Sequence, residues 1–167
     1  MSLEALRQAV GQILSLPHGE IVIVYEGFAS GLKAKQLFDQ LITPWDPDTK
    51  HRFKMWDFSG LRIDALRVRA IEDAVMADIV CISLEATTEL PAAVRDWAEK
   101  WANYSAPQHR TLVALLEPTD DLFADQTPLI ALLRDIAQRA DAKFLIIRAE
   151  TVASQQKTYS QEPLYCV

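Results

Sequence analysis

The chain has 167 residues, of which 50% are hydrophobic and 24% charged. This is the composition of a folded domain, and it excludes a disordered or cysteine-stapled chain. The 17 Lys and Arg against 23 Asp and Glu give a formal net charge of −6. Because this charge repels phosphate backbones and anionic lipid, we expect neither nucleic acid nor a membrane as a partner.

The first predicted element is an amphipathic helix over residues 1–16. Its apolar positions are Leu3, Leu6, Val10, Ile13 and Leu14. Polar residues among them interrupt the continuous apolar centre of a secretory signal, and no run in the chain reaches the roughly 18 apolar residues of a membrane span. The sequence therefore predicts a cytoplasmic protein, with Cys81 and Cys166 as reduced thiols.

Five runs predict strands. Four of them, residues 21–25, 78–84, 111–116 and 144–147, are short, apolar and rich in branched side chains, as is typical of parallel strands buried on both faces. The fifth run, residues 52–58, mixes charged with apolar residues, which favours a place at a sheet edge.

Four stretches between these runs repeat apolar residues at helical spacing. Their apolar positions are Ala34, Leu37, Phe38, Leu41 and Ile42; Leu66, Ala70, Ala74 and Val75; Val94, Trp97, Ala98 and Trp101; and Leu129, Leu132, Leu133, Ile136 and Ala137. Ser30 and Thr127 are the expected caps of the first and fourth helices, and Pro91 and Pro128 suit the first turns of the third and fourth.

Strict alternation of strand and helix predicts an α/β fold, a three-layer sandwich around a five-stranded parallel sheet. The commonest strand order for such a chain is 2-1-3-4-5, which places the charged second strand at an edge. We expect a single α/β domain over residues 1–167, ending in an irregular polar tail, residues 149–167. The extra helix at residues 1–16 should then cover the sheet face that a last helix would otherwise cover.

The carboxyl ends of the strands are the expected location of a ligand site, because loops and helix amino termini converge there. Gly27 and Gly31 would let backbone amides approach an anion, although turn geometry and capping explain them as well. The spacing matches neither a dinucleotide fingerprint nor a Walker loop. The candidate ligand-binding residues follow the first and third strands: Glu26, Gly27, Ser30, Gly31, Ser83, Glu85, Thr87 and Thr88.

Catalytic chemistry has little support in the sequence. His18, His51 and His109 each precede a strand, so they are expected at the opposite edge, and no Gly-x-Ser-x-Gly motif surrounds Ser83. We therefore predict no catalytic residue, no cofactor and no metal. The acidic residues of the carboxyl edge indicate a solvated rim, with a magnesium site as the alternative; they are Glu26, Asp57, Glu85, Glu117, Asp120 and Asp121.

Other residues of note have structural interpretations. Trp97, Trp101 and Tyr104 are expected in the core, with a partner-binding patch as the alternative. The basic group on the second helix is expected to be a solvated face; it consists of Arg62, Arg67 and Arg69.

The order of the elements and the sequences of residues 21–26, 77–83 and 140–145 resemble those of the response-regulator receiver domain, which has a flavodoxin-like fold. The resemblance implies that the family's acidic pair falls on Tyr25 and Glu26 and its phosphoacceptor aspartate on Ser83. Its later hydroxyl residue and lysine fall on Leu116 and Ile147. Since only Glu26 keeps the family's residue type, the resemblance implies a module that has lost phosphorylation chemistry.

The leading expectation is thus a non-catalytic, receiver-like regulatory or protein-interaction module of bacterial signal transduction. It would act through a protein partner, and a homo-oligomer is compatible with the sequence. The alternative is a flavodoxin-like protein that binds a small anion or nucleotide with the loops after strands 1 and 3. A third hypothesis is a magnesium-dependent hydrolase that uses Glu26, Asp57 and Glu85.

Overall fold

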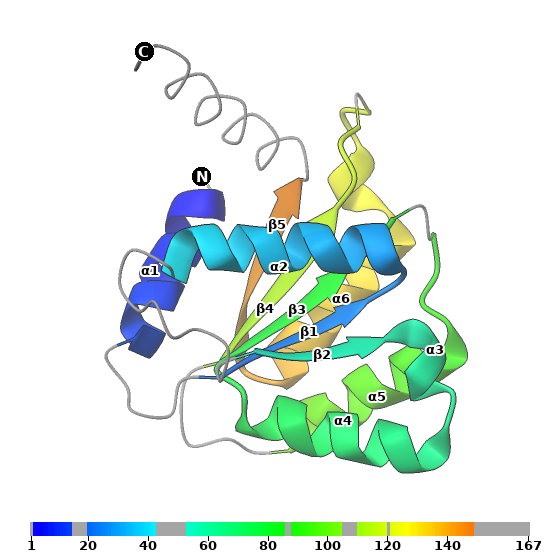
Figure 1. Ribbon diagram of the computed structural model, residues 1–167. Helices are drawn as coiled ribbons and strands as arrows, with labels where there is room; N and C mark the ends of the chain where they lie inside the picture. Colours follow the sequence, from blue (N-terminus) through cyan, green and yellow to red (C-terminus); the bar gives the residue numbers. More distant parts are fainter. Residues whose placement is uncertain are drawn as a thin grey trace, which may run out of the picture.

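The computed structural model describes residues 2–14, 20–42, 53–85, 88–104, 110–119 and 121–148, and its elements follow the predicted alternation (Figure 1). The strands are β1 (Ile21–Tyr25), β2 (Phe53–Asp57), β3 (Ile79–Ser83), β4 (Arg110–Leu116) and β5 (Ala142–Arg148). The helices are α1 (Ser2–Leu14), α2 (Phe28–Ile42), α3 (Phe58–Leu61), α4 (Asp64–Met76), α5 (Ala92–Asn103) and α6 (Pro128–Arg139), with the short 3₁₀ helix η2 (Ala124–Gln126) before α6.

The five strands form a single parallel sheet in the order β2-β1-β3-β4-β5, which confirms the predicted fold class and strand order. Tyr25 pairs in register with Asp57 on one side and with Ser83 on the other, so the last residues of β1, β2 and β3 are level. The mixed run forms β2 at the predicted edge, where its residues are only partly buried or exposed.

Helices cover both faces of the sheet. On one face, alternate residues of β1, β3, β4 and β5 pack with α1 and α2. On the other, the intervening residues pack with α3, α4, α5 and α6 around Trp97 and Trp101, both of which are fully buried as predicted. This is the expected three-layer sandwich (Figure 1).

The first helix has the predicted role of covering β5. Leu6 and Val10 of α1 are buried in the same cluster as Leu145 and Ile147 of β5. The apolar face of this amphipathic helix therefore covers the last strand of the sheet.

Several local predictions were wrong. Ser30 is not the cap of its helix, because α2 begins two residues earlier, at Phe28. Pro91 precedes the first turn of α5 as its cap residue rather than lying within it. Tyr104 is half exposed instead of belonging to the core. Thr127 does cap α6, where its hydroxyl accepts a hydrogen bond from the Ile130 amide at 3.3 Å.

Some predictions concern residues outside the described ranges. These are the three histidines His18, His51 and His109, the candidate Thr87, Asp120, Cys166 and the tail at 149–167. Cys81, by contrast, is fully buried in β3, and this burial raises the pKa of its thiol. Over the described ranges, no helix combines the length and the apolar character that crossing a bilayer requires.

Candidate functional site

Between β1 and β3, the connections that leave the carboxyl edge of the sheet change from one face to the other. These strands are neighbours, yet α2 leaves β1 toward one face and α5 follows β3 on the opposite face (Figure 1). This is the topological switch point at which open α/β sheets bind their ligands. The loops after β1, β2 and β3 therefore build the candidate site.

At the switch point the turn after β1 is bonded to the end of β3. The Glu26 amide donates to the Ser83 carbonyl at 3.0 Å, and the Ser83 hydroxyl donates to the Ser30 carbonyl at 2.8 Å. The Glu85 amide in turn donates to Oε2 of Glu26. The structure thus brings together Glu26, Gly27, Ser30, Ser83 and Glu85, and gives the buried Ser83 hydroxyl a structural partner.

The amino end of α2 already has an anion bound to it, and the anion belongs to the chain. Oε1 of Glu85 accepts a hydrogen bond from the Ser30 amide at 3.1 Å. A Cβ atom at Gly27 would lie 2.8 Å from that same oxygen, so the missing side chain is what admits the carboxylate. The Gly27 amide is bonded to the Ser30 hydroxyl at 2.9 Å. The sequence left a capped turn and an external anion as alternatives here, and the contact of Glu85 with this turn was not predicted.

Two other candidates contribute differently from expectation. A Cβ at Gly31 would meet the Tyr25 ring at 2.8 Å, so this glycine makes room for an aromatic side chain and not for an anion. Burial, and after it the neighbouring Asp57 carboxylate, raises the pKa of the Tyr25 hydroxyl. Thr88 lines a separate pocket beside Glu85.

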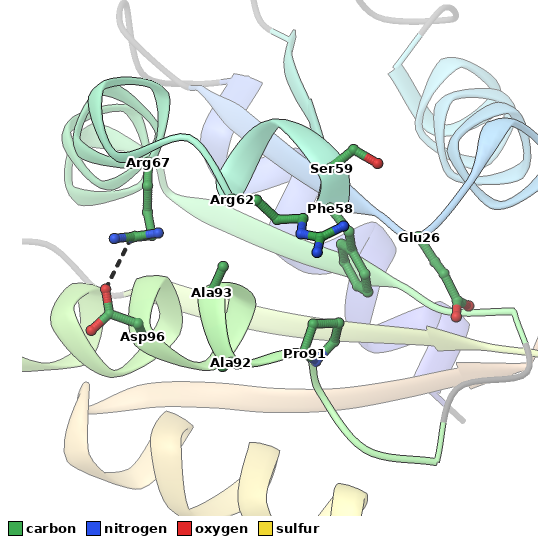
Figure 2. Close-up of a pocket in the computed structure, with 9 residues that line it drawn as sticks. All are labelled: Glu26, Phe58, Ser59, Arg62, Arg67, Pro91, Ala92, Ala93 and Asp96. Carbon is green, nitrogen blue, oxygen red and sulfur yellow. Dashed lines mark ion pairs between the residues drawn. The ribbon is translucent and has the colours of Figure 1, made fainter.

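Described residues line two pockets at this edge, and the larger of them has a volume of about 700 Å³ and lies between α3 and α5 (Figure 2). Glu26 lies at one end of it and the ion pair of Arg67 with Asp96 at the other, with Phe58, Ser59, Arg62 and the first residues of α5 between them. Its walls therefore come from the segments that follow β1, β2 and β3.

Arg67 is fixed in the pocket wall. Its Nε lies 3.0 Å from Oδ2 of Asp96, a second nitrogen lies 2.7 Å from Oδ1 of Asp64, and the third donates to the Leu61 carbonyl at 2.9 Å. Because only 19% of this side chain is exposed, the expectation of a purely solvated basic face was wrong for Arg67. Its charge is balanced by its own neighbours.

Arg62 differs from Arg67, since within the described ranges no carboxylate lies at ion-pair distance from it. It follows α3 directly and projects into the space between α3 and α5 (Figure 2). Facing it, α5 begins after Pro91, which provides no side-chain acceptor for the first amides of the helix. A free guanidinium and uncapped helix amides together form an anion-binding environment.

The smaller pocket, of about 450 Å³, lies between the loop after β3 and the start of α6. Two of the charged groups that line it are paired: Glu117 lies 2.9 Å from Lys33, and Arg148 contacts Asp125. Thr127 caps α6, whose first residues line this pocket. In the described part of the chain, no group of three or more His, Cys, Asp or Glu gathers as metal ligands would.

Comparisons with known proteins define the fold. No family model matches the chain, and no curated protein matches its sequence significantly. Smu.1420 from Streptococcus mutans UA159 superposes with a TM-score of 0.51 at 11% identity, over 85% of this chain and 95% of that one. The Trp repressor binding protein from Bacillus subtilis gives 0.50 at 11%, over 89% and 99%.

A flavodoxin from Streptococcus pneumoniae TIGR4 gives a TM-score of 0.49 at 15% identity, covering 82% of this chain and 99% of that chain. The two superpositions at 0.50 and above show a shared architecture and nothing about activity, because identity is low and this fold serves many functions. The resemblance to the receiver domain stays a prediction. The chain has a flavodoxin-like α/β fold.

Proposed function

We propose that the protein binds a small organic anion in the pocket between α3 and α5. The observation that carries this proposal is the Arg62 guanidinium, which faces the uncapped first turn of α5 across the pocket (Figure 2). A carboxylate or phosphate there would accept hydrogen bonds from both. The volume of about 700 Å³ falls within the usual range for small-molecule sites.

The charges of the pocket favour a ligand with two kinds of polar group. Arg67 and Asp96 neutralise each other at one end, which leaves Arg62 to attract an anion. At the other end, one oxygen of Glu26 accepts from the Glu85 amide, and the second can accept from a ligand. We therefore expect a phosphate or carboxylate that also carries a hydroxyl or amino donor, as nucleotides and amino acids do.

In flavodoxins, flavin mononucleotide binds at the switch point between β1 and β3. The corresponding turn of this chain does not fit its phosphate. The Glu85 carboxylate lies against Gly27, and the Ser30 and Gly27 amides already have acceptors. The anion is for this reason assigned to the α5 side of the edge.

The proposal is tested by thermal unfolding with a panel of inorganic phosphate, adenosine monophosphate, glutamate and flavin mononucleotide. A ligand present at 100 times its Kd stabilises a protein by about 2.7 kcal/mol. We expect Arg62→Gln to abolish the stabilisation, and Arg69→Gln, at an exposed position of α4 outside the pocket, to keep it. Absence of any stabilisation, or its full retention in Arg62→Gln, would refute the proposal.

A second candidate function, self-association, is favoured by a different observation. Phe28, Leu122 and Phe123 belong to segments that follow β1 and β4, and their exposed fractions are 84%, 93% and 66%. Where large exposed apolar side chains gather on one surface, they mark a protein contact. Sedimentation of the wild type should show a concentration-dependent dimer, and Phe123→Ser should weaken it; a monomer at every concentration would exclude this candidate.

A further inference from the structure

We infer that Glu85 acts as an internal anion, which fills the amino end of α2 and keeps phosphate groups away from the switch point. The residue would thereby determine on which side of the carboxyl edge an anionic ligand can bind. This inference goes beyond the proposed function and does not depend on which ligand the α3–α5 pocket takes.

The first step is the set of donors that a phosphate would need. The opening amides of a helix have no partner within the helix and bind anions when left free. In α2, the amide of Ser30, the third residue, donates to Oε1 of Glu85 at 3.1 Å, and the preceding Gly27 amide donates to the Ser30 hydroxyl at 2.9 Å. Both donors are thus taken by groups of the same chain.

The second step concerns space. The ideal Cβ position of Gly27 lies 2.8 Å from Oε1 of Glu85 and 3.4 Å from its Oε2. A side chain at residue 27 would therefore displace the carboxylate, whereas glycine lets it lie directly against the backbone of the turn. The volume that a bound phosphate would occupy next to Gly27 already holds the Glu85 carboxylate.

The third step concerns how Glu85 is held. Its own amide donates to Oε2 of Glu26, and the amide of the preceding Leu84 donates to the Leu115 carbonyl at 2.9 Å. The backbone at Glu85 is thus attached both to β4 and to the turn after β1. Because the Glu26 carboxylate is bound to the Glu85 amide, an approaching phosphate would meet the negative charge of Glu26 as well as that of Glu85.

The test uses amide NMR spectra of the full chain during titration with inorganic phosphate. Removal of the carboxylate in Glu85→Ala should lower the apparent Kd reported by the Gly27 and Ser30 amides about tenfold, which is 1.4 kcal/mol. The matched control is Glu89→Ala, which removes an equal charge from an exposed position in the same connection between β3 and α5. This control should leave the apparent Kd at those amides equal to that of the wild type.

Equal responses in the wild type and Glu85→Ala, or equal gains in Glu85→Ala and Glu89→Ala, would overturn the inference. If Glu85→Ala does not fold, the titration is made with Glu85→Gln, because this variant keeps the size of the side chain and one acceptor oxygen but removes the charge. A lower Kd than the wild type's supports the inference, and an unchanged Kd overturns it. The amides of Ala92 and Ala93 report separately on the α3–α5 pocket. A failure of the proposed anion binding in that pocket would therefore be seen independently of the result for Glu85.

Discussion

Arg110 offers a sharp test of how this fold is held together at the amino edge of the sheet. It is the first residue of β4, and only 4% of it is exposed. Its guanidinium donates to the carbonyls of Trp101 at 3.4 Å, Tyr104 at 3.0 Å and Ala140 at 2.5 Å. These carbonyls belong to the carboxyl ends of α5 and α6, where a helix leaves its last carbonyls without their regular hydrogen bonds.

The expected cost of Arg110→Met follows from what each carbonyl retains. The Trp101 carbonyl keeps the Tyr104 amide at 3.2 Å, and the half-exposed Tyr104 can bond to water. The buried Ala140 carbonyl loses its donor, at about 1–3 kcal/mol. The contact of the guanidinium with the Trp101 ring, 4.9 Å from its centroid, adds about 0.5–2 kcal/mol.

One effect opposes this loss. Burial disfavours the charged guanidinium and lowers the pKa of Arg110, more strongly than the nearby Asp141 raises it, and methionine removes that desolvation cost. Taking these effects together, we expect a net loss of about 2–3 kcal/mol in the free energy of unfolding.

Urea unfolding followed by tryptophan fluorescence measures the difference, with the slope against urea expected to stay unchanged. The matched control is Arg134→Met, since this arginine also lies over an aromatic ring, that of Phe144, but is exposed. The control should change stability by no more than about 0.5 kcal/mol. If the two variants are equally stable, the buried carbonyls do not depend on Arg110, and the reasoning is wrong.

Four further substitutions test local features by the same urea assay. Gly11→Ala should stabilise α1 by about 0.5–1 kcal/mol, because the added Cβ meets nothing within 4 Å. Gly31→Ala should instead destabilise by about 1–3 kcal/mol, since its Cβ would lie 2.8 Å from the Tyr25 ring; a stabilised variant would contradict this. Thr127→Ala should cost about 1 kcal/mol through the lost cap of α6. Burial raises the pKa of the Asp78 carboxyl above 3.8, despite an opposing backbone hydrogen bond, so the folded state binds this proton more tightly than the unfolded state. The free energy of unfolding of the wild type therefore falls as the pH rises from 3.8 through the raised pKa of Asp78. Asp78→Asn removes this charge, so its free energy of unfolding, relative to that of the wild type, should be higher at pH 7 than below pH 3.8. An equal difference at both pH values would contradict the raised pKa.

The strands were predictable because burial on both faces requires a run of apolar residues in the sequence. A strand such as β3, with every residue buried, has to be an unbroken apolar run, and the partly exposed β2 has to be mixed. The strand order then follows from which run tolerates an edge. The role of α1 was predictable for a related reason, since the apolar residues of β5 need a cover and those of α1 repeat at helical spacing.

What the sequence did not reveal depends on single contacts between distant residues. The helix α3 has only four residues, too few for a periodic pattern, and is marked by the Asp57 carboxylate, which accepts from the Gly60 amide at 2.8 Å. The bond between Glu85 and Ser30 joins residues 55 positions apart. An acidic residue just after β3, facing a glycine turn after β1, was the signal available for it.

The way each helix begins at the carboxyl edge identifies the side of the sheet on which a ligand can bind. The α-helices that first follow β1, β2 and β4 have an acceptor from their own chain, supplied by Glu85, Asp57 and Thr127. The helix that follows β3 begins after Pro91 and has no side-chain cap. An external anion has to compete with an internal acceptor at three of these positions but not at the fourth, where Arg62 adds a positive charge that no described carboxylate neutralises. Because the α5 position also borders the larger pocket, the same feature that leaves α5 uncapped gives a ligand both a binding group and the space to reach it.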